Sequence, residues 1–427
     1  YHRPMHVIVL GAGIVGSTTA LALAERGARV TLVDAAGEPG AGTSYANGSG
    51  VTPAHAEPWN PPGTLRRLGP ALLRRDLPWC VRPGALPGLF GWGLQFLRQS
   101  SAKRYYANAR HCVRLGYYAR RCLLAMRERH GFEYHQYTHG SLELYFTAES
   151  LAEAIELRRR IGDPDIEYAE IDADELVRLE PALEPVAGNI HRALLMPNHE
   201  SGDARVFSRL AAEKAGALGA DLSLDTRAAR IIERGGRFRS LATDRGEIEA
   251  DACIVAAGCA TPALLRPLGL KPPIQPVKGY SATIEIDADA PAPTVPLLDI
   301  ERRFVTARLG PERLRIAGLA EFAGHDLGID RGRLDLLRRG AADLLPRLAA
   351  RIHSAEPNAW TGLRPMTPDG PPLIGPTPID GLHLNAGHGA MGWTQGCGSA
   401  ELAADLVLGR EPAIDPDGLL AERWLGR

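Results

Sequence analysis

Apolar residues near the start of the chain follow two different spacings. Residues 7–10 form a short and wholly apolar run, as in a buried parallel strand. Residues 14–26 show helical spacing, Gly27 ends that pattern, and a second apolar run leads to Asp34. The pattern predicts a strand, a helix and a second parallel strand within this segment.

Three glycines lie at the first strand-to-helix junction. Gly11 permits a tight turn, Gly13 lets the backbone approach a pyrophosphate, and Gly16 permits close packing of helix and strand. Free N–H groups and the helix dipole favour an anion at this position. Asp34 is placed to accept hydrogen bonds from ribose hydroxyls and to disfavour a 2′-phosphate. The unit predicts a dinucleotide site and leaves open whether the ligand is NAD or FAD.

The rest of the chain contains further helical and alternating segments. Helices are expected, with breaks in the first, over 66–130, 148–161, 208–220, 334–345 and 394–408. Strands are expected over 140–147, 228–232, 252–257, 277–286, 304–317 and 382–385, and a short strand followed by a helix over 167–183. The turn Gly310–Pro311 divides 304–317, which indicates an antiparallel sheet.

The nucleotide-binding sheet is interrupted by a long insertion. NAD dehydrogenases usually complete this domain within the first ~150 residues. Here the sheet resumes only at 252–257 and 382–385, and the glycine-rich junction 387–392 can place a helix N-terminus near a flavin ring. This layout favours FAD. We expect an α/β fold with a discontinuous Rossmann-like FAD-binding domain (5–60, 201–271 and 356–427) and an α+β substrate domain with an antiparallel sheet (61–200 and 272–355).

Composition excludes several classes of protein. The net charge of −1 over 427 residues predicts no bulk affinity for nucleic acid. The six cysteines show no CxxC spacing, and no metal-ligand cluster occurs among the 13 histidines, so we expect free thiols in a reducing compartment and no metal. No run of about 20 apolar residues occurs, which predicts a protein that does not span a membrane.

The segment 66–129 is strongly basic. It holds 14 Arg or Lys residues and two acidic residues, a net charge of +12. One interpretation is a set of helices with a solvated basic face. The other is a membrane-surface patch, where apolar side chains enter the lipid and arginines meet anionic headgroups.

Five segments together resemble the bacterial FAD-dependent D-amino acid dehydrogenases, within the D-amino acid oxidase and glycine oxidase superfamily. The resemblance covers nearly the whole chain from Met5, and its most specific pieces are TSYANGSG (43–50), AEPWNPPG (56–63), VKGYS (277–281), WTGLRPMTPDGPPLIG (360–375) and LNAGHGAMGWTQGCGS (384–399). It implies oxidative deamination of D-amino acids to 2-oxo acids and ammonia, with hydride transfer to FAD. The electrons would pass to a quinone-type acceptor of the respiratory chain.

The resemblance leaves alternatives open. One is a flavin oxidase of glycine, sarcosine or a cyclic imino acid such as D-proline or hydroxyproline, which would use O₂. Another is a flavin-binding protein without catalytic activity. For localisation, we expect a cytoplasmic protein that can lie peripherally on the inner face of the membrane.

The resemblance also implies the FAD contacts. They are Gly11, Gly13, Ile14, Val15, Gly16, Asp34, Ser44, Asn47, Gly48, Ala228, Ala257 and Gly258, with Gly362, Gly387, Gly389, Met391, Gly392, Trp393 and Thr394 toward the ring. Related amine oxidases that bind flavin covalently use a cysteine just before TPD. This chain has Arg364-Pro365-Met366 there, so we expect non-covalent FAD.

Several side chains are candidates for the substrate site. Arg364 is the candidate for the substrate carboxylate, because a guanidinium binds a carboxylate with two parallel hydrogen bonds and stays charged. Tyr280 either binds the carboxylate or amine or packs on the sheet. The remaining candidates are Lys278 near the ring or on an edge strand, His388 as a flavin contact or a packing histidine, Arg308 in the second-domain sheet, and Trp393 and His55 in the side-chain pocket. The family usually has tyrosine at the position of His55, which leaves the substrate range open.

Overall fold

The computed structural model describes residues 3–66, 74, 77–355 and 357–426. The predicted βαβ unit is present as β1 (His6–Leu10), α1 (Ile14–Glu25) and β2 (Arg29–Val33). These strands lie within a six-stranded sheet of order β19-β20-β13-β1-β2-β9. Its other strands are β9 (Asp221–Ser223), β13 (Ala252–Val255), β19 (Leu373–Pro376) and β20 (Leu382–Ala386). The parallel pairing of β1 with β13 and of β13 with β20 confirms the late return to this sheet.

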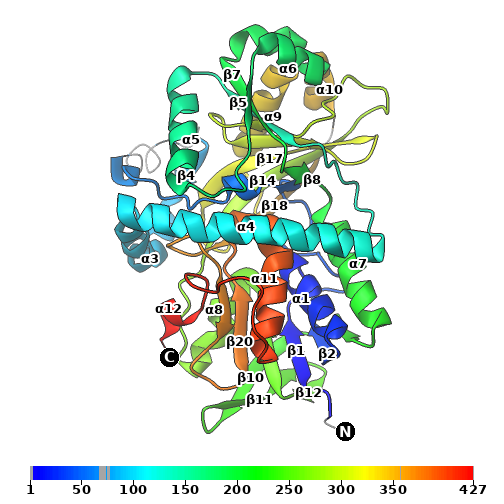
Figure 1. The fold of residues 1–427 in the computed structure, drawn as a ribbon, viewed down its shortest axis with the longest axis vertical. Helices are drawn as coiled ribbons and strands as arrows, with labels where there is room; N and C mark the ends of the chain where they lie inside the picture. Colours follow the sequence, from blue (N-terminus) through cyan, green and yellow to red (C-terminus); the bar gives the residue numbers. More distant parts are fainter. Residues whose placement is uncertain (1–2, 67–73, 75–76, 356, 427) are drawn as a thin grey trace.

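Helices cover one face of this sheet. They are α1, α7 (Ala204–Ala217) and α11 (Gly392–Val407), and α11 also packs against the long helix α4 (Ala102–His130). Figure 1 shows α4 crossing the molecule between its two halves. The opposite face is covered by an antiparallel sheet of β10 (Ala228–Arg234), β11 (Arg237–Thr243) and β12 (Gly246–Glu249), together with α8 (Thr261–Leu265). The apolar run of β13 is therefore buried on both sides, as expected for a parallel strand.

The second sheet has nine strands and is mainly antiparallel. Its order is β18-β14-β17-β16-β15-β5-β7-β6, and β4 pairs with β17. The bounds are β4 (Trp79–Val81), β5 (Ser141–Tyr145), β6 (Ala169–Ile171), β7 (Arg192–Met196), β14 (Gln275–Glu285), β15 (Leu297–Asp299), β16 (Phe304–Arg308), β17 (Arg313–Phe322) and β18 (Asn358–Met366). Only the β15–β5 and β17–β4 pairs are parallel within this sheet. The predicted antiparallel sheet is confirmed.

Further elements surround the second sheet. They are α3 (Leu86–Gln99), α5 (Ala148–Ile161), α6 (Ala173–Leu179), α9 (Arg331–Leu344) and α10 (Ala349–Ser354). The short pair β3 (Gly50–Val51) and β8 (Glu200–Ser201), the 3-10 turns η1 (Pro53–His55) and η7 (Gly389–Met391), and α12 (Glu422–Leu425) complete the parts used below. No helix of the described residues combines the length and apolarity that a membrane span needs.

The structure differs from the sequence expectation in two places. The helical pattern over 66–130 contains the strand β4, because Pro78 and Pro83 bound the segment and both disfavour helix. Residues 67–73 and 75–76 of that stretch lie outside the described residues. The strand β18 falls within 356–427, which we assigned to the FAD-binding domain, yet it pairs with β14 in the second sheet. The division into domains stays a prediction.

Candidate active site

A cavity of about 1150 Å³ runs between the two sheets. One end lies where β1 and β2 finish, and the other is formed by β14, β17 and β18. Ligands of open α/β sheets bind beyond the carboxyl ends of the strands, where this cavity begins. Its volume exceeds the roughly 300–1000 Å³ typical of small-molecule pockets, so it has room for an extended cofactor and a substrate.

The glycines of the first junction shape the dinucleotide end. Gly11 has φ +110°, and a Cβ on it would lie 2.6 Å from the carbonyl oxygen of Ala256. A Cβ on Gly16 would lie 1.7 Å from the carbonyl oxygen of Gly11, so this glycine permits α1 to pack on β1. Gly13 lines the cavity, and the nearest atom to its added Cβ would be Ser44 Oγ at 3.5 Å. The backbone at Gly13 is thus open to a ligand, whereas Gly16 lies behind it.

The carboxylate of Asp34 is held in the cavity wall by the backbone. Its Oδ2 accepts a hydrogen bond from Ala12 N (2.6 Å) and its Oδ1 accepts one from Ala36 N (2.8 Å). Each oxygen keeps a lone pair for a hydroxyl group. This arrangement fits the ribose of an ADP moiety.

Most of the predicted FAD contacts meet in this cavity. Every one of them except Gly16 lines it: Gly11, Gly13, Ile14, Val15, Asp34, Ser44, Asn47, Gly48, Ala228, Ala257, Gly258, Gly362, Gly387, Gly389, Met391, Gly392, Trp393 and Thr394. They come from seven separate stretches of the chain, between residues 11 and 394. The amino end of α11 also lies in the lining, where its free N–H groups favour an anionic group.

Arg364 provides a cation at the far end of the cavity. Its guanidinium lies over Gly279, where an added Cβ would fall 2.5 Å from the guanidinium carbon. Nη1 donates to the carbonyl of Leu319 (2.7 Å), and the cation lies 5.4 Å from the ring centre of Trp59. Burial lowers the Arg364 pKa to about 10, and no charge among the described residues adds to that shift. The cavity therefore contains a desolvated cation without a counter-charge.

The hydroxyl of Tyr280 has a buried partner. Tyr280 lines the cavity, but its hydroxyl donates a short hydrogen bond to the carboxylate of Glu321, which is fully buried. Burial, together with this carboxylate, raises the Tyr280 pKa well above its ordinary value. The hydroxyl is therefore protonated and engaged, which favours the packing interpretation over direct contact with substrate.

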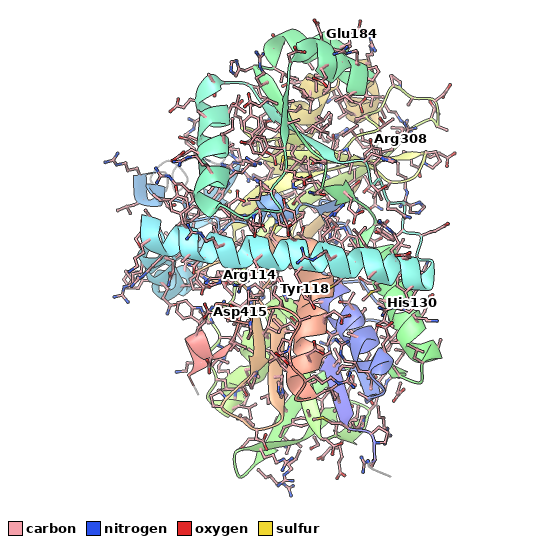
Figure 2. All side chains as sticks on the ribbon, in the orientation of Figure 1. Arg114, Tyr118, His130, Glu184, Arg308 and Asp415 are labelled. Atoms are coloured by element: carbon pink, nitrogen blue, oxygen red, sulfur yellow. The ribbon has the colours of Figure 1, made fainter. Side chains whose placement is uncertain are left out.

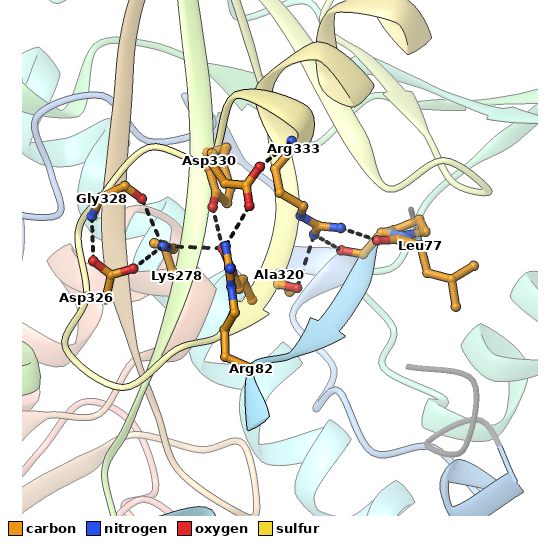
Figure 3. Close-up of polar contacts among 11 residues, drawn as sticks. Leu77, Arg82, Lys278, Ala320, Asp326, Gly328, Asp330 and Arg333 are labelled. Atoms are coloured by element: carbon orange, nitrogen blue, oxygen red, sulfur yellow. Dashed lines mark hydrogen bonds and ion pairs between the residues drawn. The ribbon is translucent and has the colours of Figure 1, made fainter. Parts of the chain in front are cut away.

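The structure does not bring Lys278 to the cavity. Its side chain is fully buried outside the lining, and Nζ donates to Asp326 Oδ2 and to the carbonyl of Gly328, both at 2.9 Å. A third partner, Glu321, lies 3.3 Å away. Figure 3 shows these contacts on the loop 323–330, beside the ion pair of Arg82 with Asp330. Lys278 binds this loop to β14. Both expectations for it are corrected, since it lies outside the cavity and β14 is paired on both sides, with β17 and β18.

Arg308 does not line the cavity, and Figure 2 labels it at the edge of the upper half of the molecule. It ends β16, and its guanidinium donates to the carbonyls of Pro311 and Ala288 at 2.6 Å. The side chain stabilises the hairpin turn at 310–311. The expectation of a substrate contact at Arg308 is thus corrected.

The glycine-rich loop 387–394 forms a wall of the cavity beside the end of β18, where His388 pairs with Met366. His388 lines the cavity, and its Nε2 lies 2.9 Å from Ser399 Oγ. Burial lowers the His388 pKa to about 3, so the imidazole is neutral. Trp393 Nε1 donates to the carbonyl of Ser49 (3.1 Å), and Thr394 Oγ1 accepts from Thr52 N (3.0 Å). These bonds fix the loop against the segment 49–52.

Some lining residues were missed by the sequence analysis. Trp59 and Trp360 both line the cavity, and an added Cβ on Gly362 would lie 2.0 Å from the indole of Trp360. Trp59 lies in the segment AEPWNPPG and Trp360 in WTGLRPM, so the motifs that carry the family resemblance already pointed to both residues. Glu321 stands in no such motif, and nothing in the sequence singles it out.

Comparisons with known proteins agree with this architecture. The family model described as DAO, FAD dependent oxidoreductase, matches residues 6–406. The D-amino acid dehydrogenase of Paramagnetospirillum magneticum is 41% identical, over 98% of this chain and 99% of that protein. The D-amino acid dehydrogenase of Rhodopseudomonas palustris is 38% identical, over 98% of each chain.

Solved structures show the same fold. The glycine oxidase from Geobacillus kaustophilus superposes with a TM-score of 0.74 at 24% identity, over 98% of this chain and 99% of that one. The L-proline dehydrogenase from P. horikoshii superposes with a TM-score of 0.73 at 18% identity, over 99% of this chain and 97% of that one. At these identities the likeness concerns the fold. The family model and the sequence relatives together show that the chain belongs to the DAO family of FAD-dependent oxidoreductases.

Proposed function

We propose that this enzyme oxidatively deaminates D-amino acids to 2-oxo acids and ammonia. The relatives at about 40% identity are named D-amino acid dehydrogenase, and the cavity supplies what an amino acid substrate needs. One observation carries the proposal. Arg364 is a half-buried cation that binds backbone carbonyls and no carboxylate among the described residues, and it lines a cavity large enough for cofactor and substrate together.

The residues of the cavity bind and orient the substrate. FAD, when bound, accepts the hydride that leaves the substrate Cα. Arg364 binds the substrate carboxylate, and the carbonyl of Leu319 and the ring of Trp59 hold its guanidinium in place. The neutral His388 adds no charge that competes with Arg364. The indoles of Trp59 and Trp360 exclude water from the carboxylate, which strengthens the ion pair.

The residues that hold FAD are proposed from the same geometry. Gly11, Gly13 and Asp34 bind the ADP moiety, and the 387–394 loop with Gly362 borders the ring. We propose that the cofactor is non-covalent. Among the described residues, Cys259 is the cysteine that lines the cavity, and its thiol donates a hydrogen bond to the carbonyl of Leu363. Burial raises the Cys259 pKa to about 12, so it is no nucleophile, and denaturation should release free FAD.

We propose a membrane quinone as electron acceptor and α3 as the membrane contact. Leu86, Phe90 and Leu94 lie four residues apart on α3, and Phe90 is 79% exposed. Exposed basic residues follow this stripe in the chain: Lys103 and Arg104, at the start of α4. Exposed apolar side chains combined with nearby cations are the arrangement that binds an anionic lipid surface.

The proposed activity is tested by its products. Purified yellow enzyme, a D-amino acid and a soluble quinone analogue should give the 2-oxo acid, ammonia and the quinol in equal amounts. Without the quinone, an oxygen electrode should record little uptake. Rapid O₂ consumption with H₂O₂ formation would instead favour the oxidase of glycine, sarcosine or a cyclic imino acid. Absence of any 2-oxo acid would contradict the proposal.

A further inference from the structure

His55 lines the substrate-side cavity and has an acidic partner. It ends the 3-10 turn η1, and its ring is 32% exposed. Nδ1 lies 3.3 Å from Glu57 Oε1. A carboxylate at Nδ1 fixes the tautomer in which Nδ1 carries the hydrogen and Nε2 keeps its lone pair. For Nε2, no protein partner occurs among the described residues.

The segment that carries His55 joins the two functional walls of the cavity. Thr52 N is bound to Thr394 Oγ1 on the 387–394 loop (3.0 Å), and the Trp59 ring lies 5.4 Å from the Arg364 cation. His55 stands between these two anchors in the chain. An amino acid held by its carboxylate at Arg364 would place its α-carbon substituents against this segment.

Four other titratable groups of the lining are less suited to accept a proton. His325, on the exposed loop 323–330, also lines the cavity, but unlike His55 it has no ion pair with a carboxylate among the described residues. Burial keeps His388 neutral with a pKa of about 3, and its Nε2 faces Ser399. The hydroxyl of Tyr280 is engaged by Glu321. Asp34 is bound by two backbone N–H groups at the dinucleotide end, and Asp299 is bound by the backbone and guanidinium of Arg302.

We propose that His55, held by Glu57, is the base that takes a proton from the substrate ammonium. This inference rests on the proposed function. An ammonium cannot release its neighbouring C–H as hydride, because the nitrogen needs a free lone pair to form the C=N bond. One N–H bond of the ammonium breaks and its proton bonds to Nε2. The lone pair left on nitrogen then forms C=N as the α-hydrogen leaves with its electron pair, so that two electrons reduce FAD.

Charged groups from several elements face this pair. Behind it lie Glu143 on β5 and His199 after β7, and Arg158 of α5 binds Glu143. Tyr105 of α4 lies near Glu57, and Arg303, after β15, shares the cavity lining. Burial opposes the charge on Glu143, but Arg158, with smaller contributions from His55 and His199, lowers its pKa to about 2. The Glu143 carboxylate behind the imidazole is therefore charged and paired with Arg158.

We expect the proton to leave His55 through polar atoms of the same region. Glu57 Oε2, Glu143 Oε1 and His199 Nε2 are buried and have no hydrogen-bond partner among the described residues. Clustered buried polar atoms of this kind are bridged by internal water. Such water can accept the proton from His55 after each turnover.

The test is the pH profile of kcat/KM with a D-amino acid. His55→Asn is expected to lower kcat/KM about 100-fold at neutral pH. In this variant the ascending limb of the pH profile should move to a higher pH, at which the ammonium group of the free substrate loses its proton without a base from the protein. Glu57→Gln keeps the imidazole and should shift the limb to lower pH, because the imidazolium loses its counter-charge, and Glu57→Asp should restore it. His130→Asn is the matched control, since His130 pairs with Glu25 at 2.9 Å outside the cavity, and it should keep the wild-type profile.

Two further readouts separate a base from a structural residue. Benzoate carries a carboxylate without an amine, so its Kd, measured by flavin absorbance, should be equal in the wild type and in His55→Asn. A wild-type pH profile in both His55→Asn and Glu57→Gln would overturn the inference. If the wild-type flavin is reduced by no D-amino acid, the proposed function fails instead. The two failures are therefore distinguishable.

Discussion

At the scale of single residues, the site depends on one arginine that lacks an acidic partner. Several buried or half-buried arginines elsewhere in the chain bind carboxylates, as Arg158 does with Glu143 and Arg127 does with Glu200. Arg333, outside the cavity, donates to the backbone carbonyls of Leu77 and Pro78. Arg364 binds only carbonyl oxygens. Burial of a cation without an anion is unfavourable, and an arriving carboxylate relieves that cost. The free energy gained when a carboxylate pairs with Arg364 is therefore available for substrate binding.

Replacement of Arg364 by leucine should weaken substrate binding. Arg364→Leu removes the charge-assisted hydrogen bonds, so KM for a D-amino acid should rise by about 100-fold or more. The enzyme should remain yellow, because FAD is held mainly by other segments. Arg308→Leu is the control, since Arg308 lies outside the cavity, and its KM should stay near the wild-type value. An unchanged KM in Arg364→Leu would refute the assignment.

At the scale of elements, the junction of β1 and α1 leaves no room for a side chain at Gly16. A methyl group there would meet the backbone carbonyl of Gly11, so α1 would have to move away from β1. Gly16→Ala should therefore lose FAD and unfold at a temperature several degrees lower. Gly91→Ala, in α3, adds a methyl to open space and should keep both properties. Flavin absorbance and thermal unfolding measure the two effects.

Helix α3 allows a test of the proposed membrane contact. Flotation with anionic vesicles should carry the protein upward at low salt and less at high salt. Phe90→Asp places a charge in the apolar stripe and should reduce binding by about tenfold. Leu218→Asp alters another exposed apolar residue, at the end of α7, and should not. If the wild-type protein stays at the bottom of the gradient with every vesicle preparation, α3 is not a membrane contact.

Local sequence patterns predict many helices and strands well, but they do not predict which side chains from distant elements contact each other. The β1–α1–β2 unit and α5 follow from residue spacing alone, because their apolar faces repeat within one element. The positions of Lys278 and Arg308 do not follow in this way. Alternation shows that Lys278 and Tyr280 share a face of β14, but Glu321 and the loop that covers Lys278 come from β17 and beyond. Pairing between distant strands decides such contacts.

At the scale of the whole molecule, buried histidines predict acid sensitivity. Burial lowers the pKa of His199 and His388 to about 3 and that of His383 to about 4, whereas an unfolded histidine titrates near 6.5. Below that pH the unfolded chain binds more protons, so stability is lost as pH falls. Each histidine contributes at most about 1.4 kcal/mol per pH unit.

The acid sensitivity can be measured without substrate. The unfolding temperature should fall steadily between pH 6.5 and pH 4.5, before most carboxylates are protonated. His383→Asn removes one titrating group and should make this fall shallower. A flat profile over that range would contradict the burial of these histidines.

The residues that we propose for cofactor and for substrate lie at opposite ends of one cavity. The first sheet supplies Gly13 and Asp34, and β18 of the second supplies Arg364, more than 300 residues later in the chain. The reaction therefore depends on how the two sheets are held together. The helix α4 lies between the halves of the molecule and packs on α11 and α5, and β18 contacts η7 at the start of α11 (Figure 1).

Anaerobic reduction of the bound FAD tests the central claim most directly. The purified enzyme is mixed with single D-amino acids and their L enantiomers, and the flavin absorbance is followed without any acceptor. We expect bleaching by at least one D-amino acid and none by its L enantiomer. Flavin that stays oxidised with every D-amino acid, or bleaches equally with both enantiomers, would contradict the proposed function.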